Sequence, residues 1–151
     1  MSASMYQGSA DMPHSDALVL FGVTGDLAYK KIFPALYAMV RKGVLTFPVI
    51  GVASSQWTIG QLRARVTDSL RQAGTIDDPC DDPGALDRLL SLMTYVSGNY
   101  NNPATFTAIK TALASAKRPA YYLAIPQSLF ATVIESLGAA GLADNARVSV
   151  E

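Results

Sequence analysis

The stretch ALVLFGVTGDLAYKKIFPALYAMVRKG, residues 17–43, decides the fold of this chain. It opens on a short apolar run with the length and composition of a buried strand. Gly22 and Gly25 then bracket a tight turn, and apolar residues recur near helical spacing from Leu27 until Gly43 ends the helix. A strand, a glycine turn and a helix in this order are typical of the phosphate-binding unit of a dinucleotide-binding fold.

The residues of the turn suit a diphosphate. Gly22 allows backbone angles that a residue with a Cβ atom resists, and Gly25 lets a pyrophosphate reach the backbone. Ala28 is small enough for the helix to pack close to the strand, and Asp26 is the expected N-cap. Amides of the first helical turn would then face the phosphates. The alternative is an ordinary strand-to-helix turn that binds nothing.

Length and composition limit the class of protein. The chain has 151 residues, of which 50% are apolar and 16% charged, which favours one globular domain. Its formal net charge is zero, so we expect neither a nucleic-acid partner nor a membrane partner. The single cysteine, Cys80, favours a reducing compartment, and we expect a cytoplasmic protein. Residues 1–16, which include the only histidine, His14, are expected to be a disordered tail rather than a signal peptide.

Strands and helices are expected to alternate along the rest of the chain. The further strands are expected at residues 47–52, 92–97, 119–125 and 146–151, and the helices at residues 58–70, 84–91, 104–116 and 128–137. Thr58 would cap the first of these helices. The alternation predicts an α/β protein with a Rossmann-type, doubly wound parallel sheet, and one dinucleotide-binding domain over residues 17–151. Because such a sheet rarely stops at its last strand, we expect it to be truncated after the fifth strand, as the front part of a longer protein.

The glycine turn also resembles a motif of a known family. GVTGDLAYKKIFPALY, which begins at Gly22, is similar to the N-terminal signature of glucose-6-phosphate dehydrogenases, G-x-x-G-D-L-x-x-x-K-x-x-P. Three later segments resemble that family too: YVSGNYNNPATF from Tyr95, YYLAIPQSLF from Tyr121 and ARVSVE from Ala146. The resemblance covers about residues 17–151.

The resemblance implies an oxidoreductase of carbohydrate metabolism. Enzymes of this family oxidise C1 of glucose 6-phosphate to the lactone and pass hydride to NADP⁺ or NAD⁺, in the oxidative pentose phosphate pathway. A Rossmann cofactor domain is followed by a larger domain with the catalytic histidine, the substrate-phosphate contacts and the oligomer interface. This chain would be the NAD(P)-binding portion of a homo-oligomeric enzyme, without a catalytic residue or turnover of its own. Glucose 6-phosphate would bind only with the missing domain.

The resemblance also implies roles for individual residues. The diphosphate-binding positions are Gly22, Val23, Thr24, Gly25, Asp26 and Leu27. Further cofactor positions after the fourth and fifth strands are Ala124, Ile125, Pro126, Phe130 and Glu151. Lys31 matches the lysine that faces the substrate, with a solvated helix lysine as the alternative. Pro34 lies inside the helix, where it should kink the axis and free the carbonyl of Lys30.

The end of the second strand departs from the family pattern. Where the family usually has an arginine for the adenosine 2′-phosphate, this chain has Ser54, followed by Ser55. No acidic residue stands there for the ribose hydroxyls of NAD⁺ either. The two serines could still donate to a phosphate or ribose, whereas Arg63 and Arg65 lie well into the next helix and are expected to be solvated. We therefore predict binding of NADP⁺ with weakened selectivity, so that NAD⁺ is tolerated.

Two other functions stay open. A stand-alone nucleotide-binding module without catalysis fits the same residues, and the reading frame after Glu151 would distinguish it from an enzyme. A short-chain reductase or sugar epimerase needs a Tyr-x-x-x-Lys pair, and no tyrosine of this chain has a lysine four residues on. The sequence shows no Cys/His cluster with metal-ligand spacing, no P-loop and no basic stripe with aromatic residues for nucleic acid.

Overall fold

The computed structural model describes residues 15–74, 84–114, 116–142 and 147–150. Its strands are β1 (Ala17–Phe21), β2 (Val49–Ala53), β3 (Met93–Ser97), β4 (Pro119–Leu123) and β5 (Arg147–Val150). Its helices are η1 (Ala28–Ile32), α1 (Phe33–Arg41), α2 (Ile59–Gln72), α3 (Ala85–Leu92), α4 (Pro103–Leu113), η2 (Gln127–Leu129) and α5 (Phe130–Ala139). His14, Cys80 and Glu151 lie outside the described residues.

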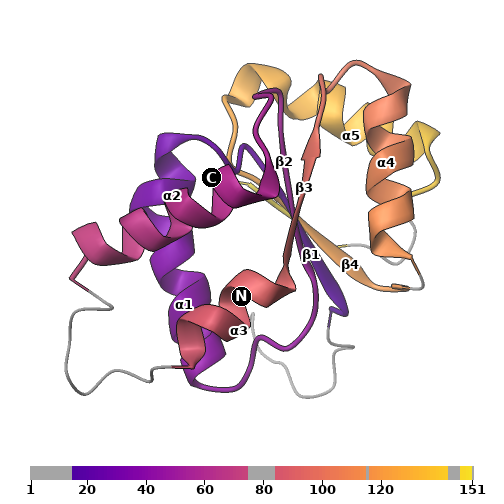
Figure 1. Ribbon diagram of the computed structural model, residues 1–151. Coiled ribbons are helices and arrows are strands. Elements are labelled where there is room, and N and C mark those ends of the chain that lie inside the picture. The colour runs from indigo at the N-terminus through magenta and orange to yellow at the C-terminus, as the bar shows by residue number, and fades with distance from the viewer. Residues whose placement is uncertain (1–14, 75–83, 115, 143–146, 151) are drawn as a thin grey trace.

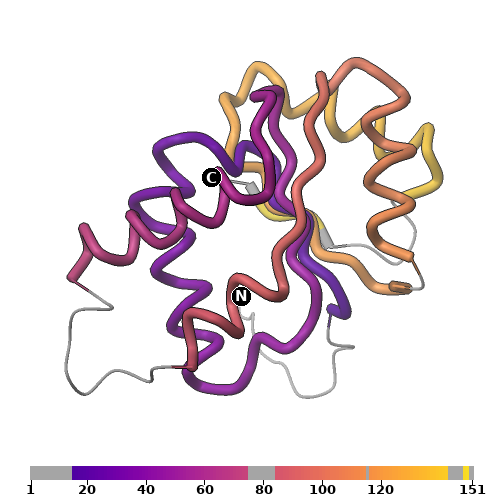
Figure 2. The backbone as a smooth tube through the Cα atoms, in the orientation of Figure 1, coloured from indigo at the N-terminus to yellow at the C-terminus, as the bar shows by residue number. Residues whose placement is uncertain are grey.

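The five strands form one parallel sheet in the order β3–β2–β1–β4–β5 (Figures 1 and 2). The chain steps outward from β1 to β2 and β3, then returns to place β4 on the other side of β1. This reversal is the topological switch point of a doubly wound sheet, and it confirms the predicted Rossmann-type fold. Phe21 pairs with both Val52 and Leu123, so β1, β2 and β4 reach the carboxyl edge at the same level.

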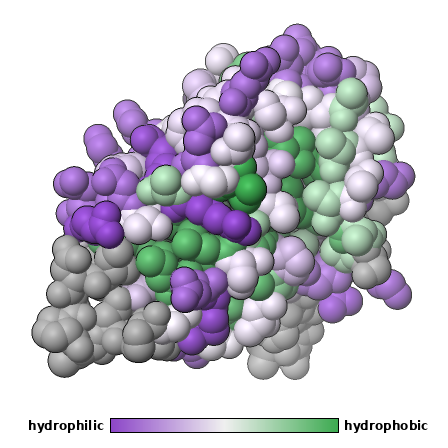
Figure 3. Space-filling view, in the orientation of Figure 1, coloured by the Kyte–Doolittle hydropathy of each residue, from purple (hydrophilic) through white to green (hydrophobic). Residues whose placement is uncertain are grey.

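Helices cover both faces of the sheet. Leu20 belongs to a buried apolar cluster with side chains of α1, α2 and α3, and Phe21 belongs to a second cluster with side chains of α4 and α5. Leu20 and Phe21 are neighbours in β1, so their side chains point to opposite faces. The two groups of helices accordingly lie on opposite sides of the sheet (Figure 1), as right-handed crossovers require. Polar side chains gather over α2 in the space-filling view (Figure 3).

The helix after the glycine turn begins with a π turn, η1, whose hydrogen bonds span five residues. A five-residue step from Tyr29 falls on Pro34, which has no N–H to donate. The hydroxyl of Ser69, on α2, donates to the Tyr29 carbonyl instead. The carbonyl that Pro34 leaves without an amide donor is therefore that of Tyr29 and not, as predicted, that of Lys30. The reason is that hydrogen bonds in a π turn span five residues, one more than in an α-helix.

Ser69→Ala is expected to lower the free energy of unfolding by about 1–3 kcal/mol, because the Tyr29 carbonyl loses its donor at a buried position. Ser69 is only 2% exposed, so water has little access to replace the hydroxyl. Urea unfolding followed by circular dichroism measures the change. Thr67→Ala is the matched control, since Thr67 bonds to the Arg63 carbonyl of its own helix in an exposed place. A loss as large for Thr67→Ala would contradict the assigned role of Ser69.

A carboxylate ties the start of β1 to the residues before β4. Asp16 accepts hydrogen bonds from the amides of Lys117 at 2.7 Å and Arg118 at 2.8 Å. The Asp16 amide donates in return to the Arg118 carbonyl at 3.2 Å. The bond from the Lys117 amide is the main reason that the pKa of Asp16 lies below its usual value. Asp16, which is expected in the disordered tail, is therefore joined to the domain.

Asp16→Asn is expected to make the free energy of unfolding depend less on pH in the acid range. A carboxyl group with a lowered folded-state pKa stabilises the fold fully above its unfolded-state pKa, and this contribution is lost as the pH falls through the folded-state pKa. We expect the wild-type chain to lose more stability than Asp16→Asn between about pH 5 and pH 2. Urea midpoints over this range measure the difference. Glu135→Gln, on the exposed surface of α5, is the control and should follow the wild-type curve.

Candidate dinucleotide-binding site

The glycine turn leaves β1 directly against the chain that follows β4. Gly22 has a φ of +84°, and its amide donates to the Val52 carbonyl at 2.8 Å. A Cβ atom added to Gly22 would lie 2.1 Å from the carbonyl oxygen of Ala124. The Gly25 amide closes the turn by donating to the Gly22 carbonyl at 3.0 Å. Gly22 is therefore required by the fold itself, both for its backbone angle and for this close approach.

Gly25 is not required by the packing of the chain. Its φ is not positive, and an added Cβ atom would meet only the Gly22 carbonyl oxygen at 3.4 Å, an ordinary contact distance. The residue is exposed. Glycine is also common directly before a helix, and a ligand that approaches the backbone closely is a second physical reason for a glycine here.

The first turn of the helix offers free amides beside Gly25. The first intrahelical bond runs from the Tyr29 amide to the Gly25 carbonyl at 3.2 Å, so the amides of residues 26–28 precede the helical ladder. Such amides and the helix dipole favour an anion. The prediction of Asp26 as N-cap is wrong, because the chain becomes helical one residue earlier and Asp26 lies in the first turn. Its carboxylate lies instead 3.9 Å from Nη2 of Arg65.

Hydroxyl groups join the glycine turn to the loop after β2. Thr24 Oγ1 lies 3.1 Å from Ser55 Oγ, within hydrogen-bond distance. The Ser55 carbonyl is held from β3, because it accepts bonds from the Ser97 hydroxyl at 2.9 Å and from the Tyr95 hydroxyl. Partial burial raises the pKa of Tyr95, which favours the donating form of its hydroxyl. Three strand ends are thus connected at the carboxyl edge, with Ser54 exposed beside them.

A cavity of about 370 Å³ lies at this carboxyl edge of the sheet. It is lined by Ser54, Asn99, Tyr100, Asn101, Leu129 and Thr132, which follow β2, β3 and β4. Burial raises the pKa of Tyr100 to about 12, so its hydroxyl remains protonated at neutral pH. A crevice outside the strand ends, near the switch point, is where α/β sheets bind ligands. The sequence predicts only a loop at the asparagines, and the signal that indicates them is their position directly after a parallel strand.

The residues predicted after the fourth strand lie across β1 from Ser54. The Ala124 amide donates to the Phe21 carbonyl at 2.9 Å, which fixes the chain beside the glycine turn. Ile125 and Phe130 are half-buried against the cluster on the α4–α5 face, while Pro126 is exposed. The structure therefore brings the glycine turn, the two serines and the segment after β4 to one edge.

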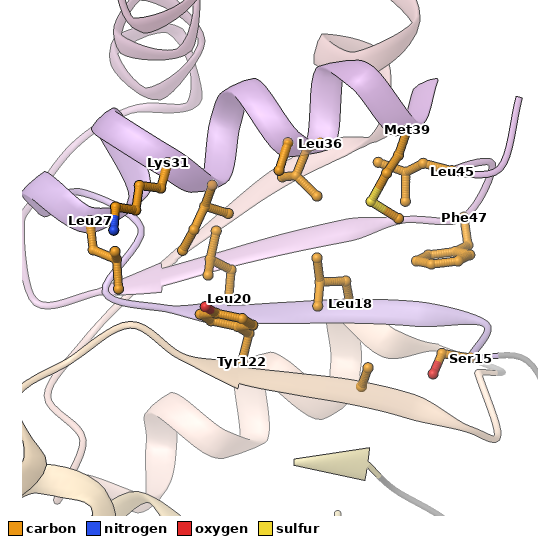
Figure 4. A pocket seen from close by; sticks show the side chains of 13 residues that line it. Ser15, Leu18, Leu20, Leu27, Lys31, Leu36, Met39, Leu45, Phe47 and Tyr122 are labelled. Atoms are coloured by element: carbon orange, nitrogen blue, oxygen red, sulfur yellow. The ribbon is translucent and has the colours of Figure 1, made fainter. Parts of the chain in front are cut away.

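Lys31 lies on a different face from the crevice. It is exposed on η1 and lines a pocket of about 470 Å³ between α1 and the strands β1 and β4. Leu18, Leu20 and Tyr122 form the floor of this pocket, and Lys31 lies at the same end of it as Leu27 (Figure 4). The pocket is otherwise mostly apolar, so Lys31 brings a positive charge to its end nearest the glycine turn.

Residues 15–74, 84–114, 116–142 and 147–150 contain no group of three or more His, Cys, Asp or Glu residues that could hold a metal ion. Within the same residues, no helix has the length and apolar character needed to cross a membrane.

Known proteins match this chain over most of its length. The family model "Glucose-6-phosphate dehydrogenase, NAD binding domain" matches residues 19–151. Glucose-6-phosphate 1-dehydrogenase 1 of Mycobacterium tuberculosis is 39% identical over 91% of this chain and 28% of its own length. Glucose-6-phosphate 1-dehydrogenase of Saccharomyces cerevisiae is 30% identical over 97% of this chain and 31% of its own length.

Solved structures agree with the sequence matches. The X-ray crystal structure of glucose-6-phosphate 1-dehydrogenase from Mycobacterium avium has a TM-score of 0.83 and 39% identity, and covers 91% of this chain. The match uses 29% of that chain, so this chain spans less than a third of the relatives it resembles. Together with the glycine turn and the parallel sheet, these matches show that the chain belongs to the glucose-6-phosphate dehydrogenase family, as its NAD-binding domain.

Proposed function

We propose that this chain binds NADP⁺, and tolerates NAD⁺, as the cofactor domain of an enzyme that oxidises glucose 6-phosphate at C1 to 6-phosphogluconolactone. The main support is Gly25, an exposed glycine that neither its φ nor its neighbours require. A diphosphate at the backbone accounts for this glycine and for the free amides beside it. The family of the chain supports the same cofactor class.

The residues present suit each part of the cofactor. The amides of residues 26–28 and the hydroxyl of Thr24 would bind the diphosphate, and Ser54 and Ser55 would face the adenosine ribose. The segment 124–126, with Phe130, would line the nicotinamide side. The bound cofactor supplies the acceptor for the hydride that leaves the substrate. Lys31 remains our proposal for a residue on the substrate side, since its ammonium group could bind a sugar phosphate.

The remaining properties of the whole enzyme are also proposals. The chain spans 28% of the length of its Mycobacterium tuberculosis relative, and the larger domain implied by the family resemblance would supply the catalytic histidine. We therefore propose that the 151-residue chain does not turn over glucose 6-phosphate alone. A homo-oligomeric, cytoplasmic enzyme remains the prediction for the complete protein.

Calorimetric titration of NADP⁺ and NAD⁺ into the 151-residue chain tests the cofactor. We expect saturable binding of both, with NADP⁺ preferred by less than about a hundredfold, because one charged hydrogen bond changes affinity by about this much at most. Absence of binding by both would overturn the proposed function. Absorbance at 340 nm with glucose 6-phosphate and NADP⁺ should show no turnover, and turnover would contradict the proposal that a further domain is needed.

Gly25→Ala is expected to weaken NADP⁺ binding by at least about tenfold while changing the free energy of unfolding by less than about 0.5 kcal/mol. The added methyl group meets no tight contact in the chain, but it stands where the diphosphate would approach. Calorimetry and urea unfolding measure the two effects on one preparation. Unchanged NADP⁺ affinity in Gly25→Ala would remove the main support for the site.

The stand-alone binding module is the second candidate, and the cofactor titration does not exclude it. The nucleotide sequence after the codon for Glu151 decides between the two candidates. ARVSVE resembles the strand before the family's E-K-P-F-G motif, up to its glutamate. Continuation into K-P-F-G supports the enzyme, and a stop codon supports the module.

A further inference from the structure

Arg65 is not the solvated helix arginine that the sequence predicts. Only 28% of its side chain is exposed, although it lies on α2 among polar residues. The guanidinium carbon lies 4.5 Å from the ring centroid of Tyr29 and 5.8 Å from that of Trp57. Its Nε atom is buried and has no hydrogen-bond partner within the described residues. Two aromatic rings therefore hold a cation in a defined place, with a donor that the chain leaves unsatisfied.

The guanidinium lies close to residues of the two segments that would hold the adenosine end of the cofactor. Its Nη2 is 3.9 Å from Asp26, which follows Gly25. Its guanidinium carbon is 5.8 Å from the ring centroid of Trp57, two residues after Ser55, whose hydroxyl lies 3.1 Å from that of Thr24. The end of the second strand in a Rossmann fold faces the adenosine ribose, and an arginine near it accommodates the 2′-phosphate of NADP⁺. Arg65, on α2, is the arginine that lies beside Trp57 in the loop that follows this strand.

The electrostatic surroundings leave Arg65 able to bind an anion. Its ion pair with Asp26 is longer than a hydrogen bond, and the Asp26 side chain is 87% exposed, so the pair is weak. A guanidinium group has five N–H donors in a planar fork that matches phosphate oxygens. Because the rings of Tyr29 and Trp57 already restrict the side chain, binding would cost less conformational entropy.

We propose that Arg65 binds the adenosine 2′-phosphate of NADP⁺ and thereby sets the preference of this site for NADP⁺ over NAD⁺. This inference rests on the proposed function, because it assumes a dinucleotide on the glycine turn. Arg65 would also give the 2′-phosphate a charged partner, whereas Ser54 and Ser55 provide only hydroxyl groups. Arg65 would thus take the role that the missing arginine after the second strand has in the family pattern.

The test compares two adenosine ligands that differ by one phosphate. Adenosine 2′,5′-bisphosphate carries the 2′-phosphate, and 5′-AMP lacks it. We expect Arg65→Gln to weaken binding of the bisphosphate by about tenfold to a hundredfold, and binding of 5′-AMP by less than about threefold. Calorimetry measures both, and fluorescence of Trp57, the only tryptophan of the chain, gives a second readout beside Arg65. NADP⁺ and NAD⁺ titrations of the same variant should give nearly equal affinities.

Arg63→Gln is the matched control, since Arg63 lies on the same helix and is exposed. It should leave the ratio of the two affinities unchanged. Arg65→Met retains a long side chain to pack against the rings and removes the charge, so it decides the question if Arg65→Gln proves unstable. If wild-type chain binds 5′-AMP and both dinucleotides but the Arg65 variants keep their preference for the 2′-phosphate, the role of Arg65 is overturned and the cofactor site stands. If the wild-type chain binds none of these ligands, the proposed function fails first.

Discussion

Gly22→Ala is expected to lower the free energy of unfolding by about 3 kcal/mol or more, from two separate causes. The first is the φ of +84°, since a left-handed conformation costs about 1–2 kcal/mol for a residue with a Cβ atom. The second is overpacking, because the new Cβ atom would lie 2.1 Å from the Ala124 carbonyl oxygen, and forcing extra atoms into a packed place costs about 1–3 kcal/mol. Urea unfolding measures the sum. We expect NADP⁺ binding to be lost as well, since β1 and the chain after β4 must separate.

Gly43→Ala is the control for the first cause alone. Gly43 has a φ of +77°, and nothing lies within 4 Å of an added Cβ atom. It should therefore lose only about 1–2 kcal/mol, the cost of the backbone angle. Equal losses at Gly22 and Gly43 would show that the contact with Ala124 does not limit the choice of residue at the turn.

Phe21→Ala is expected to cost about 3–5 kcal/mol, the range for removal of a buried aromatic ring. Phe21 is fully buried at the end of β1, and its ring centroid lies 5.7 Å from that of Tyr100, 6.1 Å from Phe106 and 6.3 Å from Tyr121. These rings come from the loop after β3, from α4 and from β4. Because Phe21 directly precedes Gly22, the cavity would also loosen the glycine turn and weaken NADP⁺ binding.

Urea unfolding of Phe21→Ala and of Phe21→Leu separates burial from ring geometry. Leucine refills much of the space, so Phe21→Leu should cost less than about 1.5 kcal/mol. A loss below this value for Phe21→Ala itself would mean that the neighbouring rings close the cavity, and that Phe21 does not hold the edge of the sheet together. Calorimetry with NADP⁺ on Phe21→Leu shows how far the turn depends on an intact ring cluster.

The features that could be predicted from sequence are those with local signals. The apolar run before Gly22 predicts both ends of β1 correctly. Thr58 forms the expected cap of α2, as a capping box with Gln61. The alternation of short apolar runs with helical patterns predicts a parallel sheet, because each type of element has its own period. Right-handed crossovers then predict helices on both faces of the sheet, which the two apolar clusters confirm.

The features that could not be predicted depend on how distant segments meet. Nothing around Pro34 shows that Ser69, from another helix, satisfies the carbonyl that the proline leaves free. Helical periodicity places Arg65 on a polar face, but it cannot show that the rings of Tyr29 and Trp57 lie over it. The N-cap prediction for Asp26 failed by one residue, since Asp26 is already helical and Gly25 stands directly before the helix.

The hydrogen bonds between Asp16 and residues 117 and 118 have a consequence for the order in which the domain forms during synthesis. Asp16 and Lys117 are 101 positions apart, whereas Thr24 and Ser55 are separated by 31 positions. Short loops close sooner than long ones, and domains begin to fold from the N-terminus as the ribosome extends the chain. The half with the glycine turn, both serines and Arg65 can therefore assemble on the nascent chain before β4 emerges. The addition of β4 and the hydrogen bonds of Asp16 then complete this part of the sheet.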